Sequence, residues 1–241
     1  MFPNKISPMS SENQNQNRYK IVGKSKVCSP ANLHNNSKRN YLIPKIGVSG
    51  TADMSFLGEE VFEIAKNIGR EIAKQGAVMV SGATTGFPYW AASGCKEECG
   101  VSFGFSPAAS AREHAEVYRL PLEYMDMITY TGFGYNGRDL LFVRSCDAIV
   151  IGPGRIGTFH EFAIAYEDQR PLGILLSDKH WETDNIIKHI IDNSHRPNKK
   201  VVYDHDPARL IEKLLELVKE DRKHISVYKN QDNETGFNSI L

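Results

Sequence analysis

Residues 152–161 have the types and the spacing of an anion-binding site. They read Gly-Pro-Gly-Arg-Ile-Gly-Thr-Phe-His-Glu, and they follow the apolar run 148–151, which is typical of a buried strand. From Thr158 onward, apolar residues recur at helical spacing. A helix that begins just after a glycine turn offers free backbone N–H groups and the positive end of its dipole to a ligand. We therefore predict a phosphate site here, with the carboxylate of Glu161 at its edge.

The same residues have a purely local alternative. Thr-x-x-Glu at the start of a helix is a capping box, in which Thr158 and Glu161 only satisfy the N–H groups of the first turn. Both interpretations remain open on the spacing alone. His160 precedes Glu161 on the same helix, and neighbouring helical residues point apart. We therefore expect His160 to pack against the protein or to lie at its surface.

The elements that position these residues alternate regularly along the chain. Runs of four to six apolar residues alternate with helical patterns, which predicts an α/β fold. We expect a single domain built on a doubly wound, Rossmann-like parallel sheet of about seven strands. The expected strands are 45–50, 77–80, 101–105, 125–130, 148–151, 171–176 and 200–203. The expected helices are 57–72, 88–98, 138–145, one from about residue 158, 185–193 and 207–223.

Four of the expected strands end in glycine-containing turns: the first, second, fourth and fifth. In such a sheet, ligands bind beyond the carboxyl ends of the strands, near the point where the strand order reverses. The four turns therefore predict a site at that edge. Outside the domain, which we place at residues 41–225, residues 1–40 are rich in Asn, Ser, Gln and Lys and are expected to be disordered or weakly ordered. Residues 226–241 are expected to form a tail.

The composition argues against several classes of function. The 29 basic side chains balance the 29 acidic ones, so nothing indicates a nucleic-acid or membrane partner. The 4 cysteines form no metal-binding pattern, and we expect them to be reduced thiols. No apolar run approaches the ~20 residues that span a bilayer, and the start of the sequence lacks a signal-peptide pattern, so we expect a cytoplasmic protein. The dinucleotide fingerprint and the P-loop are both absent.

Residues 153–161 resemble the Pro-Gly-Gly-x-Gly-Thr-x-x-Glu signature of the LOG-like family, once labelled lysine decarboxylase-like. That family belongs to a superfamily of Rossmann-like proteins related to SLOG and DprA. Arg155 stands where the pattern has its second glycine. The turns at 49–51 and 81–86 also look like the family's first two turns, and the family's arginine on the preceding helix corresponds to Arg138.

The resemblance implies a function, because characterised LOG-like proteins are similar to cytokinin riboside 5′-monophosphate phosphoribohydrolases. We expect hydrolysis of the N-glycosidic bond of an AMP-like nucleotide, without metal or cofactor, in a homodimer whose partner subunit helps to complete the pocket. Arg138 and Glu161 would be the catalytic residues. The residues expected to bind the phosphate and the nucleotide are Ser49, Gly50, Gly82, Ala83, Thr84, Gly154, Arg155, Ile156, Gly157 and Thr158.

Two alternatives to this hydrolase were weighed. A nucleotide or phosphoribosyl sensor of the same fold, without turnover, is favoured by the replacement of a family glycine by Arg155. Decarboxylation with pyridoxal phosphate requires a Schiff-base lysine, and none of the four turns contains a lysine. The sensor therefore stays open, and we discount the decarboxylase.

Overall fold

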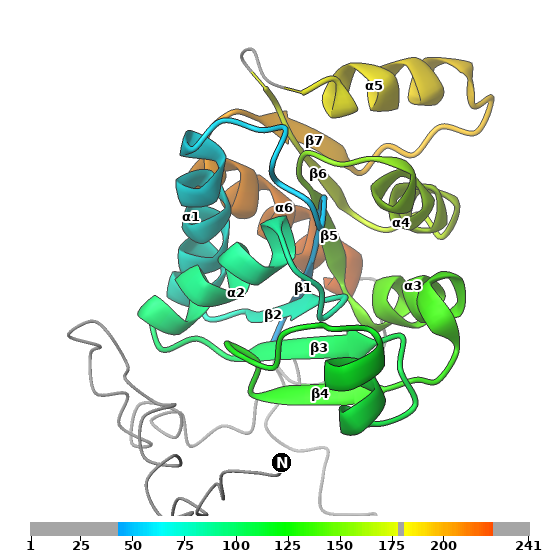
Figure 1. The fold of residues 1–241 in the computed structure, drawn as a ribbon. Helices are drawn as coiled ribbons and strands as arrows, with labels where there is room; N and C mark the ends of the chain where they lie inside the picture. Colours follow the sequence, from blue (N-terminus) through cyan, green and yellow to red (C-terminus); the bar gives the residue numbers. More distant parts are fainter. Residues whose placement is uncertain (1–42, 178–180, 224–241) are drawn as a thin grey trace, which may run out of the picture.

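Seven short strands form one sheet in the computed structural model, which describes residues 43–177 and 181–223 (Figure 1). The predictions for residues 1–40 and 226–241 lie outside these residues. The strands are β1 (Lys45–Ser49), β2 (Val78–Ser81), β3 (Ser102–Ser106), β4 (Met127–Tyr130), β5 (Ala148–Ile151), β6 (Leu172–Leu175) and β7 (Val201–Asp204).

The sheet is entirely parallel and has the order β4-β3-β2-β1-β5-β6-β7. From β1 the chain proceeds outward to β4 at one edge, and then returns to place β5 on the other side of β1. The strand order therefore reverses between β1 and β5. The predicted doubly wound, Rossmann-like α/β domain is confirmed.

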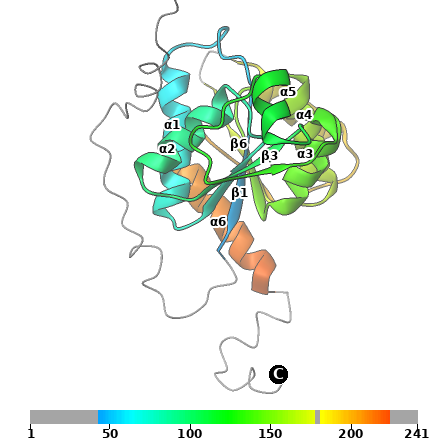
Figure 2. The ribbon, with the colours of Figure 1, turned by 60° about the horizontal axis from the view of Figure 1, so that its bottom comes forward.

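Helices cover both faces of the sheet (Figure 2). The layer formed by α1, α2 and α6 packs on one face, and α3, α4 and α5 lie on the other. The helices are α1 (Glu60–Lys74), α2 (Phe87–Glu97), α3 (Gly134–Ser145), α4 (Ile156–Glu167), α5 (Thr183–Asn193) and α6 (Pro207–Lys223), with a short π-helix, η2 (Glu113–Val117), before β4.

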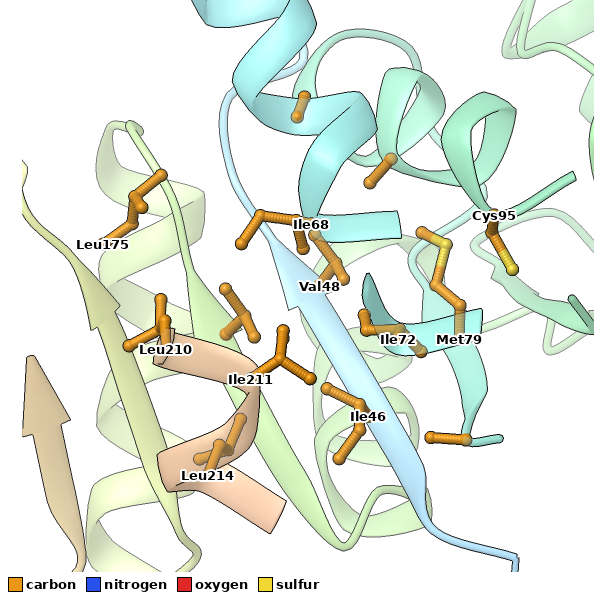
Figure 3. Close-up of a cluster of buried hydrophobic side chains, with 14 of the residues drawn as sticks. Ile46, Val48, Ile68, Ile72, Met79, Cys95, Leu175, Leu210, Ile211 and Leu214 are labelled. Atoms are coloured by element: carbon orange, nitrogen blue, oxygen red, sulfur yellow. The ribbon is translucent and has the colours of Figure 1, made fainter. Parts of the chain in front are cut away.

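The core on the α1 side shows why the sheet and helices assemble as they do. In Figure 3, Ile46 of β1 lies between Ile72 of α1 and Ile211 of α6. All three side chains are fully buried, and burying a side chain of this size contributes about 1.5–3 kcal/mol. A Cβ at Gly69 of α1 would lie 1.8 Å from the Ala91 carbonyl oxygen of α2, so glycine allows these helices to pack closely.

Three helices begin two or more residues earlier than their sequence patterns suggest, and α2 begins one residue earlier, at Phe87. Helix α3 begins at Gly134 rather than at 138, α4 at Ile156 rather than near 158, and α5 at Thr183 rather than at 185. Glycines in the first turns of α3 and α4 explain two of these differences, because glycine is a weak helix former. Tertiary contacts determine these helix starts despite the low local propensity.

The cysteines agree with the expectation only in part. Cys95 and Cys146 are free and buried, and burial raises the pKa of the Cys95 thiol to about 12. Cys99 is disulfide-bonded, so the expectation of a reduced thiol is wrong there.

Within residues 43–177 and 181–223, no helix has the length and apolar character needed to cross a membrane.

Candidate active site

Two turns meet at the point where the strand order reverses. β1 ends at Ser49 and β5 ends at Ile151, and the two residues are paired in the sheet register. The Gly152 N–H donates to the Ser49 carbonyl (2.9 Å), and the Thr51 N–H donates to the Pro153 carbonyl (2.7 Å). The two turns are thereby tied together at the crevice where sheets of this kind bind ligands.

A cavity of about 750 Å³ lies at this edge of the sheet. Each of the four predicted turns contributes to its lining, for example through Gly50 after β1, Gly82 after β2, Asn136 after β4 and Gly157 after β5. A cavity of this size is suited to a small-molecule ligand. The expectation that the four turns share one edge is therefore confirmed.

The start of α4 provides free backbone donors to this cavity. Its N-cap is Arg155, and no side chain caps the helix. The first intrahelical bond runs from the Phe159 N–H to the Arg155 carbonyl (3.0 Å), so the N–H groups of residues 156–158 have no intrahelical acceptor. Thr158 lies inside the first turn and Glu161 inside the second. The capping-box interpretation is therefore wrong, and residues 156–158 all line the cavity.

The glycine turn before α4 is held from behind by α5. Thr183 Oγ1 accepts a hydrogen bond from the Gly154 N–H (2.9 Å) and donates one to the Gly154 carbonyl (3.0 Å). A Cβ at Gly154 would lie 2.0 Å from Thr158 Oγ1, so only glycine fits between the turn and the helix. These contacts fix the backbone that would surround an anion.

Glu161 lies in a buried polar cluster beside the cavity. Its Oε2 accepts a hydrogen bond from Ser49 Oγ, and its Oε1 lies 3.7 Å from Arg138 Nη1. The side chains of Arg138 and Glu161 are only 5% and 10% exposed. A Cβ at Gly82 would lie 1.4 Å from Arg138 Nη1, so the guanidinium occupies the space that glycine leaves open. The end of β1, the turn after β2, α3 and α4 therefore each contribute one residue to this cluster.

Burial raises the pKa of Glu161 to about 7, because it disfavours the charged carboxylate. The Arg138 guanidinium and the hydrogen bond from Ser49 act in the opposite direction, whereas the nearby carboxyl group of Asp139 raises the pKa further. At neutral pH, both the protonated and the ionised form of Glu161 are therefore populated. A carboxyl group whose pKa lies near neutral pH is suited to general base catalysis.

Arg155, the departure from the family pattern, lies at the rim of the cavity. Its guanidinium carbon is 4.0 Å from the centre of the Phe56 ring, a cation–π contact. Phe56 belongs to the segment between β1 and α1, and Arg155 precedes α4. The contact therefore joins the two sides of the crevice near the first turn of α4.

The structure places most of the predicted binding residues on the cavity surface. Three of them are set back from it: Ser49, Ala83 and Gly154. Ser49 and Ala83 are buried, Ser49 acts behind Glu161, and Gly154 turns toward Thr183. The predicted residues that line the cavity directly are Gly50, Gly82, Thr84, Arg138, Arg155, Ile156, Gly157, Thr158 and Glu161.

Sequence reasoning missed a pair of side chains in the lining, Asp139 and His160. His160 Nδ1 lies 2.8 Å from Asp139 Oδ2, and both residues line the same cavity as Glu161. His160 lies at the surface, as expected, with a side chain that is 42% exposed, and it also contacts Asp139 at the edge of the cavity. The pair joins α3 to α4, and no spacing along the chain reveals it. Among the described residues, no cluster of three or more His, Cys, Asp or Glu side chains is arranged to hold a metal ion.

Comparison with known proteins agrees with this architecture. The model of the SLOG cluster4 family matches residues 43–211. An uncharacterized protein from Archaeoglobus fulgidus is 28% identical over 131 residues, which cover 54% of this chain and 79% of that protein. The superfamily that the glycine motif resembles is thereby confirmed.

Two solved structures share the fold over nearly their whole length. The molybdenum cofactor binding protein from the phototrophic bacterium Rippkaea orientalis has a TM-score of 0.57 and 25% identity, and the match covers 74% of this chain and 97% of that one. The Moco carrier protein from Chlamydomonas reinhardtii has a TM-score of 0.59 and 23% identity, with coverage of 74% and 99%. The second similarity is one of fold alone.

Proposed function

The chain belongs to the SLOG cluster4 family, and we propose that it binds a nucleoside 5′-monophosphate and hydrolyses the N-glycosidic bond, giving a free base and ribose 5-phosphate. The observation that carries the proposal is the buried Glu161 carboxyl group. It lies 3.7 Å from a buried arginine, and its pKa is raised to about 7. A nucleotide phosphate at the start of α4 would lie within the same cavity as this pair.

The phosphate would bind at the first turn of α4. The N–H groups of residues 156–158 and the helix dipole favour an anion there. Gly157 suits this role because a Cβ at this position would meet nothing within 4 Å, so its backbone is open to a ligand. The Thr158 hydroxyl and the Arg155 guanidinium would add donors.

Glu161 and Arg138 would act on the sugar. Breaking the N-glycosidic bond develops positive charge on the ribose ring, as in glycoside hydrolysis. In its ionised form, Glu161 would stabilise this charge and take a proton from the attacking water. The Nε of Arg138 faces Asp139 Oδ1 at 3.3 Å, and Arg138 lines the cavity, so the ion pair would hold the guanidinium beside the substrate. This step requires neither a metal nor a redox cofactor.

Base release from nucleoside 5′-monophosphates tests the proposal directly. The protein is incubated with AMP, GMP, CMP and UMP, and free base is quantified by chromatography beside the Glu161→Gln variant. We expect turnover of at least one nucleotide by the wild type and a loss of about 10²-fold or more in the variant. No base released by concentrated wild-type protein would refute hydrolysis, and equal release by both proteins would refute the role of Glu161.

A second candidate is a nucleotide-binding or phosphoribosyl-binding protein without turnover. Arg155 favours it, because its side chain stands where the family pattern has a glycine and reaches across the rim to Phe56. The protein from Rippkaea orientalis is described as a cofactor-binding protein. Calorimetry with the same nucleotides separates the candidates: the binding protein predicts heat of binding for wild type and Glu161→Gln alike, with no base released by either.

We further propose a homodimer, supported by an apolar stripe at α3. Phe133, Leu140 and Leu141 are 69%, 37% and 38% exposed, and their spacing places them on one side of the helix. In a two-fold dimer, the same stripe of each copy would meet the other. Light scattering should give twice the chain mass for the wild type and the monomer mass for Leu141→Glu, whereas Ile190→Glu on α5 should stay dimeric. A monomeric wild type would refute this assembly.

The absence of a nucleic-acid partner stays a prediction.

A further inference from the structure

A buried carboxylate fixes the orientation of an imidazole in the cavity. Asp139 follows Arg138 on α3, and its side chain is only 6% exposed. Its Oδ2 lies 2.8 Å from His160 Nδ1, and its Oδ1 lies 3.3 Å from Arg138 Nε. Because an ionised carboxylate only accepts hydrogen bonds, the Nδ1 atom of His160 carries the hydrogen. The Nε2 atom is left for another partner.

His160 is also accessible to a ligand. Its side chain is 42% exposed, and the residue lines the same cavity as Glu161 and Arg138. Consecutive residues on a helix point in different directions. His160 and Glu161 therefore leave α4 in different directions, although both lie beside Asp139 of α3 and both line the cavity. Two separate groups of this kind are what an acid and a base acting on one bond require.

We propose that His160, oriented by Asp139, is the general acid that protonates the leaving base. This inference rests on the hydrolysis proposed above. His160 would be a catalytic residue that touches the base, and Asp139 a positioning residue that acts through it. The proposed ligand of His160 Nε2 is a ring nitrogen of the nucleobase.

The reaction needs such an acid, because a purine leaves poorly as an anion. The bond between C1′ and the base nitrogen breaks with its electron pair going to the base, and the imidazolium gives its Nε2 proton to the base. The water oxygen bonds to C1′, and its proton goes to Glu161. Proton transfer through solvent from Glu161 to His160 then restores both groups. Arg138 is unsuited to the acid role, because a guanidinium does not give up its proton in proteins.

A substrate whose leaving group needs no proton isolates this role. The full-length protein is assayed with AMP and with 4-nitrophenyl riboside 5-phosphate, which releases a stable phenolate. We expect His160→Gln to lower kcat on AMP by about 100-fold and to change turnover of the nitrophenyl substrate by less than about threefold. Glu161→Gln should slow both substrates. His189→Gln, at an exposed position of α5 outside the cavity lining, should change neither.

Asp139→Asn tests the positioning role separately. It should lower kcat on AMP by about tenfold or more with little change in KM, because the imidazole loses its orientation while the substrate contacts remain. Because Asp139 also faces Arg138 and raises the pKa of Glu161, some loss on the nitrophenyl substrate is expected, but it should be several-fold smaller than the loss on AMP. A general loss of folding would instead reduce both activities together.

The outcomes distinguish this inference from the proposed function. The general-acid role would be overturned if His160→Gln lost equal activity on both substrates, or lost no activity on AMP. Either result would leave the proposed hydrolysis intact. A wild type that binds AMP but releases product from neither substrate would overturn the proposed hydrolysis, and the general acid with it. Selective loss on AMP supports both.

Discussion

Replacing Glu161 with glutamine removes a buried ionisable group and nearly preserves its shape. Burial raises the pKa of this carboxyl group from 4.5 to about 7 in the folded protein. Each unit corresponds to about 1.4 kcal/mol, so ionising Glu161 lowers the free energy of unfolding by about 3 kcal/mol in total. The sign follows from proton binding. Between pH 4.5 and 7, the folded state holds more protons than the unfolded state, so this group makes the protein less stable as the pH rises.

Urea unfolding of wild type and Glu161→Gln at pH 5 and pH 8 measures this effect. The amide resembles the protonated acid, so the two proteins should be similar in stability at pH 5. From pH 5 to pH 8, the advantage of the variant should grow by about 2–3 kcal/mol. The same substitution at Glu167, an exposed residue of α4 that pairs with Arg196 (2.6 Å), measures the combined effect of an amide on the helix and the loss of a surface ion pair. Taking the difference between each variant and wild type removes the titration of all other groups.

A constant or shrinking difference would refute the reasoning. It would mean that Arg138 and Ser49 outweigh burial and keep Glu161 ionised well below neutral pH. The same pKa also predicts that the rising limb of kcat/KM against pH lies near 7, because the base must be ionised, while loss of the proton from the general acid gives the falling limb. Stability and activity should therefore change in opposite directions over the same pH range.

Three further substitutions probe the site. Gly82→Ala should abolish base release while the protein stays folded by circular dichroism, because the new Cβ would lie 1.4 Å from Arg138 Nη1. Thr183→Val removes both hydrogen bonds to Gly154, so it should lower the free energy of unfolding by about 1–3 kcal/mol. It should also weaken AMP binding in calorimetry, although Thr183 does not line the cavity. Arg155→Gly should leave the free energy of unfolding within about 1 kcal/mol of wild type and should change the affinity for nucleotides. Together, these results would show that Arg155 acts on ligand binding and not on the fold. Unchanged base release in Gly82→Ala, unchanged stability in Thr183→Val or unchanged nucleotide affinity in Arg155→Gly would contradict the corresponding contacts.

The sheet was predictable from the sequence because its signals are local. Each strand is a short apolar run, and the turns that follow contain glycine, so both the number of strands and the edge at which the turns meet follow from the pattern. The start of α4 was not predictable to the residue. Arg155 is an unusual N-cap without a side-chain bond, and the position of Ile156 depends on the turn held by Thr183 from α5.

The candidate site was predictable where it depends on strand ends and less so where it depends on helix packing. Glu161 and Arg138 follow turns at the same edge of the sheet, and they lie 3.7 Å apart. Asp139 and His160 meet only because α3 packs against α4 at one particular register. Side chains 21 positions apart on two helices leave no periodic signal in the chain.

The exchange of a family glycine for Arg155 alters the rim of the cavity and leaves the fold of the turn intact. Gly154, one residue earlier, has no room for a side chain, because a Cβ there would lie 2.0 Å from Thr158. Arg155 itself has an extended backbone (φ −120°, ψ −153°), which any residue adopts, and its side chain lies over Phe56 at the surface. The substitution therefore introduces no backbone strain. We expect it to affect only the binding of a ligand that lies next to Arg155 and Phe56. Since Arg155 contacts Phe56 and not the buried Glu161, the two proposals separate in space: the rim would select the phosphate ligand, and the buried cluster would carry out the proposed hydrolysis.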